Sequence, residues 1–130
     1  MNFTLGIKVS TKKQIDKYIT TCTTTFKMFD HDVIISKNKA NLWHFSAKRN
    51  DKKYLVYCAP NLSKVKSIIK IALKKVPADS KLVVICNTFT NEEKQLAEES
   101  NYALVDIHTL QKYGTEMIEA KSNDETSLAA

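Results

Sequence analysis

Lysine is the residue type whose spacing in this chain most clearly suggests a chemistry. Five lysines lie within residues 64–75, and no aspartate or glutamate occurs from Lys52 to Ala78. They are Lys64, Lys66, Lys70, Lys74 and Lys75. On a helix, Lys66, Lys70 and Lys74 share one face because they are four residues apart. Such a face contacts phosphates and releases counterions on binding, although a solvated amphipathic helix shows the same pattern.

A second basic group precedes this segment and consists of Lys48, Arg49, Lys52 and Lys53. Together the two groups are the candidate nucleic-acid-binding residues. Arg49 is the only arginine of the chain. Arginine is the usual bidentate reader of guanine and phosphate, so its scarcity favours contact with the nucleic-acid backbone that does not depend on sequence. A genome rich in A and T would produce the same excess of lysine.

The charge of the chain is distributed unevenly along its length. Residues 1–81 contain 17 Lys and Arg against 5 Asp and Glu, whereas residues 82–130 contain 3 against 9. The first part therefore has a net charge of +12 and the second part −6. This asymmetry predicts a basic surface for a polyanion. It also predicts an acidic C-terminal third that stays free, binds a protein partner or screens the basic surface.

Other site chemistries have little basis in the residue types. The three histidines lie in different predicted elements, and none has a histidine or cysteine partner at metal-ligand spacing. Cys22, Cys58 and Cys86 are odd in number and far apart, so we interpret them as reduced core thiols. Gly6 and Gly114 are the only glycines, too few for a loop that cradles phosphates. We expect no metal and no cofactor.

The elements that must position these residues can be predicted from hydrophobic spacing and turn residues. Helices are predicted at Ser10–Phe29, Ser63–Val76, Thr90 or Asn91 to Ser100, and Thr109–Ala120. Extended segments are predicted at Met1–Val9, Asp32–Ser36, Leu42–Ala47, Lys53–Ala59, Leu82–Cys86 and Ala103–Ile107. Polar turns between the three strands from residue 32 to residue 59 indicate an antiparallel meander, and the two later apolar runs indicate buried parallel strands.

The predicted fold class is therefore α/β, with a mixed central sheet flanked by helices. Residues 1–120 form one domain and residues 121–130 a flexible acidic tail. No apolar run has the length of a signal peptide or a membrane span. We therefore expect a cytoplasmic or otherwise intracellular protein that is not secreted and has no membrane partner.

This order of elements resembles the restriction-endonuclease-like superfamily, the PD-(D/E)xK nucleases. The most specific stretch is Lys81–Gly114, which is similar to the end of Mrr-type endonuclease domains. In it, a buried strand leads to a polar turn and an acidic helix, and a second buried strand ends in Asp106 before another helix. The resemblance implies a restriction-endonuclease-like core in which an antiparallel meander is followed by parallel strands.

The catalytic residues of that family are only partly matched. Its chemistry needs an acid at the start of the second strand, and an acid or Gln plus a Lys, two apart, on the third. Asp32 matches the first acid, but Tyr57 and Ala59 stand where the third strand should supply the acid and the lysine. One carboxylate does not assemble a Mg²⁺ site. The resemblance therefore implies a degenerate site without catalytic activity.

The leading hypothesis is a non-catalytic, nuclease-like module that binds the nucleic-acid backbone within a larger machine. The stretch ALVDIHTLQKYG bears a fainter likeness to the fifth subunit of eukaryotic RNA polymerases, which favours a small subunit of such a machine. One alternative is a Mg²⁺-dependent DNA endonuclease of Mrr type whose site has migrated, with Lys64 or Lys66 reaching toward it. Another is a protein-interaction adaptor whose acidic C-terminal third docks the partner.

Overall fold

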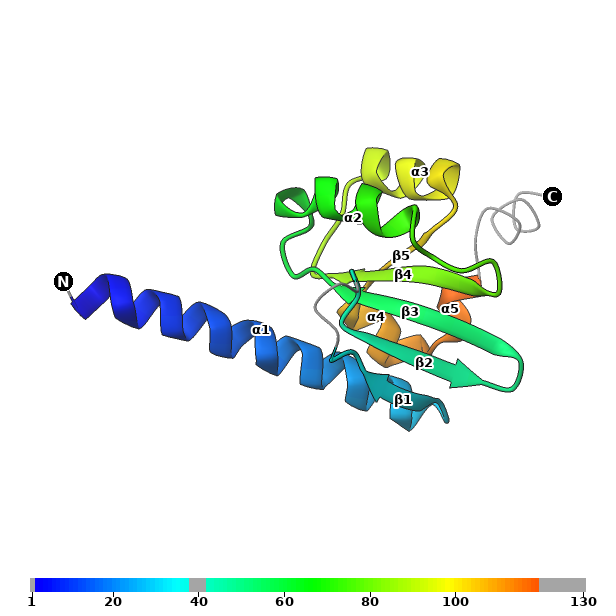
Figure 1. Ribbon diagram of the computed structural model, residues 1–130, viewed down its shortest axis with the longest axis horizontal. Helices are drawn as coiled ribbons and strands as arrows, with labels where there is room; N and C mark the ends of the chain where they lie inside the picture. Colours follow the sequence, from blue (N-terminus) through cyan, green and yellow to red (C-terminus); the bar gives the residue numbers. More distant parts are fainter. Residues whose placement is uncertain (1, 38–41, 120–130) are drawn as a thin grey trace.

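Five strands form one mixed sheet in the computed structural model, which describes residues 2–37 and 42–119 (Figure 1). The strands are β1 (Asp32–Ile35), β2 (Phe45–Arg49), β3 (Lys52–Cys58), β4 (Ser80–Cys86) and β5 (Ala103–Asp106). The helices are α1 (Asn2–Met28), α2 (Lys66–Leu73), α3 (Asn91–Ser100), α4 (Ile107–Tyr113) and α5 (Glu116–Glu119), with a 3-10 turn η1 (Leu62–Lys64) before α2. The turn predicted at 38–41, Ala120 and the predicted tail 121–130 lie outside the described residues.

The strands lie side by side in the order in which they occur along the chain. β2 pairs antiparallel with both β1 and β3, whereas β3–β4 and β4–β5 are parallel pairs. The predicted antiparallel meander and the predicted parallel neighbours are therefore confirmed. The α/β class with a mixed sheet flanked by helices is confirmed as well.

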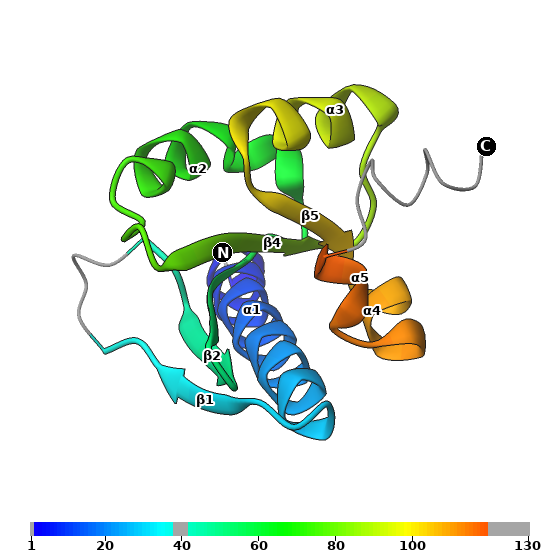
Figure 2. The ribbon, with the colours of Figure 1, turned by 90° about the vertical axis from the view of Figure 1, so that its right-hand side faces the viewer.

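Helices cover the two faces of the sheet and create two hydrophobic cores (Figure 2). The core between the sheet and α1, α4 and α5 contains Cys22, Phe26, Phe45, Val56, Ile85 and Leu110. The core under α2 and α3 contains Leu55, Ile69, Ala72, Leu82, Val84 and Ala97. Residues 82–86 of β4 are buried throughout, because successive side chains enter opposite cores. The continuous apolar run of this strand predicted that position.

The N-terminal segment differs from its prediction. Residues 2–9 are helical instead of extended, whereas α1 ends at Met28, one residue before the predicted end of the helix. The β-branched run 20–25 stays helical because this part of α1 packs on the sheet, where Cys22 and Phe26 are fully buried. Its threonine hydroxyls are satisfied within the helix, as Thr25 Oγ1 is by donating to Thr21 O at 2.7 Å. Neither α1 nor any other helix of the described residues is both long and apolar enough to cross a bilayer.

Two further boundaries around β2 and α2 were predicted wrongly. Residues 42–44 precede β2 instead of belonging to it, and β2 extends to Arg49. The helix predicted at Ser63–Val76 is shorter, because a 3-10 turn occupies its first residues and α2 ends at Leu73. Asn61 makes no capping bond to this turn, and its Oδ1 instead accepts a hydrogen bond from Ser63 Oγ.

The last predicted helix, Thr109–Ala120, is divided in two. Helix α4 begins earlier than predicted, at Ile107, because Asp106 caps it by accepting from the Thr109 backbone N–H at 2.8 Å. Ile107 is therefore helical, and β5 ends at Asp106. Gly114 interrupts the helix with a φ of 88°.

Candidate nucleic-acid interface

The β2–β3 hairpin brings four of the predicted basic residues into direct opposition. The strands are joined by the two residues Asn50 and Asp51, and Asn50 adopts the left-handed conformation, with φ 57°. This turn fixes the register so that Lys48 lies opposite Lys53 and Arg49 lies opposite Lys52. All four side chains are exposed. Two successive cross-strand pairs therefore carry like charges.

Like charges directly opposite one another destabilise an antiparallel pair. One nearby carboxylate offsets part of this repulsion, because Asp32 of β1 lies opposite Lys48 on its other side. Asp51 lies in the turn itself. The hairpin nevertheless presents four cations within the six positions from Lys48 to Lys53, an arrangement that suits an anionic partner better than it suits the isolated hairpin.

Helix α2 carries the second basic group on its outer side. Ile69 and Ala72 are buried under this helix, whereas all five predicted lysines from 64 to 75 are exposed. Lys66 forms an ion pair with Glu93 of α3 at 3.3 Å. A hydrogen bond from the Thr90 backbone N–H, together with Lys66, lowers the pKa of Glu93. Among the described residues, no carboxylate lies within ion-pair distance of Lys70, Lys74 or Lys75.

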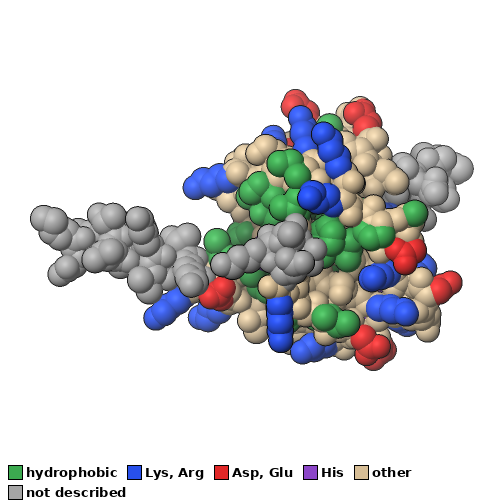
Figure 3. Space-filling view, viewed as in Figure 1, with side chains coloured by type: hydrophobic (Ala, Val, Ile, Leu, Met, Phe, Trp, Pro, Cys, Tyr) green, Lys and Arg blue, Asp and Glu red, His purple; other side chains and the backbone are tan. Residues whose placement is uncertain are grey.

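The two basic groups approach each other at one end of the sheet. Lys53 pairs in register with Ser80, the first residue of β4. Since Lys74 and Lys75 directly precede the connection to Ser80, the end of α2 and the hairpin lie at the same end (Figure 1). Figure 3 shows Lys and Arg side chains over α2 and over the hairpin on one face, with hydrophobic side chains between them and some Asp and Glu at the hairpin. We call this face the basic face.

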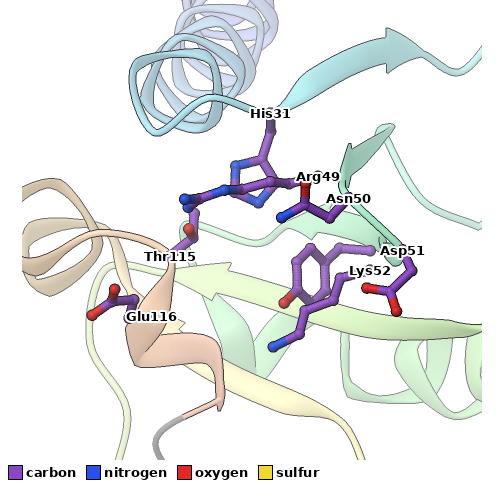
Figure 4. Close-up of a pocket in the computed structure, with 8 residues that line it drawn as sticks. His31, Arg49, Asn50, Asp51, Lys52, Thr115 and Glu116 are labelled. Carbon is purple, nitrogen blue, oxygen red and sulfur yellow. The ribbon is translucent and has the colours of Figure 1, made fainter.

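A pocket of about 290 Å³ lies beside the hairpin (Figure 4). Arg49 and Lys52 line it from the hairpin, and Thr115 and Glu116 line it from the opposite wall. His31 forms part of the lining, donates from Nδ1 to the Phe29 carbonyl oxygen at 2.9 Å, and has a pKa lowered by burial. The pocket therefore combines cations, carboxylates and a neutral imidazole.

The residues predicted for a degenerate nuclease site do not come together. Asp32 begins β1, the first strand and the edge of the sheet, whereas the family pattern places its acid at the start of the second strand. Through Lys48, Asp32 is in register with Lys53, and Tyr57 lies four positions further along β3. That separation is about 13 Å along the strand axis alone. Among the described residues, no three His, Cys, Asp or Glu side chains are placed to hold a metal ion.

Tyr57 and Ala59 instead lie at the opposite end of the sheet and line a second pocket, of about 520 Å³. The backbone N–H of Ala59 donates to the Ile85 carbonyl at 2.7 Å, which extends the β3–β4 pairing beyond Cys58. The ring of Tyr57 contacts His44, with 4.7 Å between ring centroids. This pocket is not visible in the sequence, because its lining comes from segments that are far apart along the chain.

Comparisons with protein-family models, curated proteins and solved structures find no match to this chain.

Proposed function

We propose that this chain is a non-catalytic, nuclease-like module that binds the phosphate backbone of nucleic acid through the basic face. The observation that carries the proposal is the register of the hairpin, which places Lys48 opposite Lys53 on the face of the sheet that α2 covers. Arg49 and Lys52 pair on the other face, beside the 290 Å³ pocket. The repulsion between Lys48 and Lys53 is relieved when a phosphate lies between the two cations. The five exposed lysines of residues 64–75, in α2 and directly before and after it, extend the same face.

The nuclease-like part of the proposal draws on the order of elements. A helix and an antiparallel meander are followed by two crossovers to adjacent parallel strands, which is the arrangement that the resemblance to the restriction-endonuclease-like superfamily implies. The non-catalytic part draws on the separation of Asp32 from Tyr57 and Ala59. A small basic domain of this kind suits a subunit of a larger nucleic-acid machine such as an RNA polymerase.

Salt dependence of binding is the direct test. The full chain and fluorescein-labelled duplex DNA are titrated by fluorescence anisotropy from 50 to 300 mM NaCl. The slope of log affinity against log salt is about −0.9 for each phosphate neutralised on B-form DNA. We expect a steep slope and weak dependence on DNA sequence. A protein-interaction adaptor would show neither binding nor a salt slope.

Three double variants with the same change in charge locate the contact surface. They are Lys48→Glu with Lys53→Glu in the hairpin, Lys70→Glu with Lys74→Glu on α2, and Lys17→Glu with Lys27→Glu on the exposed side of α1. The hairpin and α2 variants are expected to weaken binding and each reduce the slope by about 2. The α1 variant is the control, because α1 packs on the other face of the sheet. Equal loss in all three would indicate attraction by net charge and contradict a defined basic face.

A further inference from the structure

The 520 Å³ pocket lies where α/β sheets commonly bind ligands, at the carboxyl ends of parallel strands. Its floor is formed where β3 and β4 end, and Asn87 extends this floor by donating its backbone N–H to the Pro60 carbonyl at 3.4 Å. One wall comes from α1 through Tyr18, and another comes from Lys64 before α2. Its volume falls within the range of about 300–1,000 Å³ that is usual for small-molecule sites.

The lining offers hydrogen-bond donors and a positive charge. Lys64 is the only charged side chain among the described residues that line the pocket. His44 accepts a hydrogen bond at Nδ1 from the Cys58 backbone N–H at 2.8 Å, so its neutral ring carries its proton on Nε2. Asn61 uses Oδ1 to accept from Ser63, which leaves its NH₂ group as a donor.

Tyr18 supplies a further observation at this pocket. Its hydroxyl oxygen is buried and has no hydrogen-bond partner among the described residues. Burial raises the pKa of Tyr18, so the hydroxyl keeps its proton and remains a donor. A buried donor without a partner costs free energy. This unsatisfied donor belongs to a residue of the pocket lining.

Tyr57 adds an aromatic surface to these donors. The side chain is half-buried, and its ring is held against His44 at an interplanar angle of 46°. Nucleobases stack on such rings regardless of base identity. A cation, several donors and an aromatic ring, with no carboxylate among the described lining residues, fit an acceptor-rich aromatic anion.

Lys64 also connects the pocket to the basic face, because it lies in the 3-10 turn directly before α2, whose exposed side carries Lys66 and Lys70. We propose that the pocket holds one unstacked nucleotide of the bound strand, with its base on Tyr57 and its phosphate on Lys64. This inference rests on the proposed nucleic-acid binding, and it adds a preference for unpaired nucleotides.

The test compares a 12-nucleotide single strand with a blunt hairpin duplex, using the full chain and variants in the pocket. Tyr57→Leu removes the ring, whereas Tyr57→Phe keeps it. We expect Tyr57→Leu to weaken single-strand binding about 5- to 150-fold and Tyr57→Phe to leave it nearly unchanged. Duplex affinity should be unaltered in both variants. Equal loss for strand and duplex, or no loss for either, would overturn the pocket proposal.

A second variant keeps the proposal testable if Tyr57→Leu does not fold. Asn87 is exposed at the pocket, and Asn87→Asp adds a negative charge with almost no change in shape. Single-strand affinity should fall at least severalfold, whereas Asn101→Asp, the same change at an exposed position after α3, should leave it unaltered. Unchanged affinity in Asn87→Asp would contradict the proposal.

The remaining arms separate the pocket from the basic face. Lys70→Glu with Lys74→Glu should weaken binding of both the strand and the duplex. If this double variant binds both as tightly as the unaltered chain does, the proposed basic face is wrong, whereas the pocket proposal is judged by the Tyr57 and Asn87 variants. Free nucleoside 5′-monophosphates are titrated separately by NMR. If they bind as tightly as the 12-nucleotide strand, the pocket belongs to a free nucleotide and the strand proposal is overturned. If the strand, the duplex and the mononucleotides all fail to bind, both proposals are refuted.

Discussion

His44 Nδ1 accepts a hydrogen bond from the backbone N–H of Cys58 at 2.8 Å, which joins the segment before β2 to the end of β3. The bond requires an unprotonated Nδ1, and burial lowers the pKa of His44 in the same direction. The imidazole therefore has two reasons to stay neutral. The bond also fixes Nε2 as the ring nitrogen that carries the proton.

We expect the free energy of unfolding to decrease as pH falls below about 6.5. In the unfolded chain, His44 and His31 titrate near their ordinary pKa of about 6.5, whereas burial lowers both pKa values in the folded protein. The unfolded state then binds more protons, so stability is fully present above pH 6.5 and is lost as pH falls toward the folded-state pKa values. The limiting slope is about 1.4 kcal/mol per pH unit for each histidine.

Urea unfolding at pH 7.5, 6.5 and 5.5 measures this slope. His44→Asn offers an amide oxygen near the position of Nδ1 and does not titrate, so the decline should become shallower. His108→Asn changes an exposed histidine and serves as the control. If His44→Asn shows the same pH dependence as the unaltered chain, His44 is not the group that resists protonation.

The like charges of the hairpin should lower the free energy of unfolding while they raise the affinity for nucleic acid. Lys53→Glu places a carboxylate opposite Lys48 in place of a like charge. Opposite charges at such positions stabilise by about 0.2–1 kcal/mol, so the free energy of unfolding should rise by an amount of that order. Affinity for duplex DNA should fall at the same time.

The matched control for Lys53→Glu is Lys27→Glu on α1, where the substituted residue is exposed near the helix end. This variant has the same change in net charge without the opposing lysine across a hairpin. It should bind nearly as the unaltered chain does. A Lys53→Glu protein that is less stable than the unaltered chain would show that the two lysines do not repel each other appreciably.

The elements that were predicted accurately have strong local signals. Helix α3 begins where predicted because Thr90 accepts from the Glu93 N–H at 3.1 Å while Glu93 reaches back to the Thr90 N–H, a capping box visible in the sequence. β4 is apolar throughout and is buried on both faces. The break at Gly114 depends on contact with Phe29, more than 80 positions earlier, and no local pattern encodes such a contact.

The basic groups of the candidate interface were predicted from composition, but their arrangement was not. The hydrophobic pattern placed Lys48, Arg49 and Lys52 in a turn, because charged residues interrupt the alternation of apolar and polar positions. The Asn50–Asp51 pair is typical of a two-residue hairpin turn, and this signal would have extended the two predicted strands to Arg49 and Lys52. The second pocket could not be predicted, since Tyr18, His44 and Asn87 meet only through the packing of α1 and the sheet.

Gly114 offers a sharp test of the C-terminal packing. A Cβ at this position would lie 2.8 Å from Phe29 Cε1, and the backbone has φ 88°, a conformation that residues with side chains rarely adopt. Gly114→Ala is expected to lower the free energy of unfolding by about 2 kcal/mol or more. Ser100→Ala, at the exposed end of α3, should change it little. Urea denaturation distinguishes the two, and equal stabilities would contradict the close approach of Phe29.

The last prediction concerns phosphodiester cleavage, the activity implied by the resemblance to Mrr-type endonucleases. Divalent metal catalysis in that family needs at least two oxygen ligands and a cation near the attacking water. Here Asp32 lies opposite Lys48 at the edge of the sheet, remote from Tyr57 and Ala59.

We therefore expect no cleavage of plasmid, linear or single-stranded DNA in Mg²⁺ or Mn²⁺, with gel electrophoresis as the measurement. Asp32→Ala should leave duplex binding intact, or slightly increase it, because a carboxylate beside Lys48 is removed. If the purified chain nicks DNA with a metal ion and Asp32→Ala abolishes the nicking, Asp32 belongs to an active site. The non-catalytic proposal would then be wrong, since the remaining ligands must come from residues assigned here to structure.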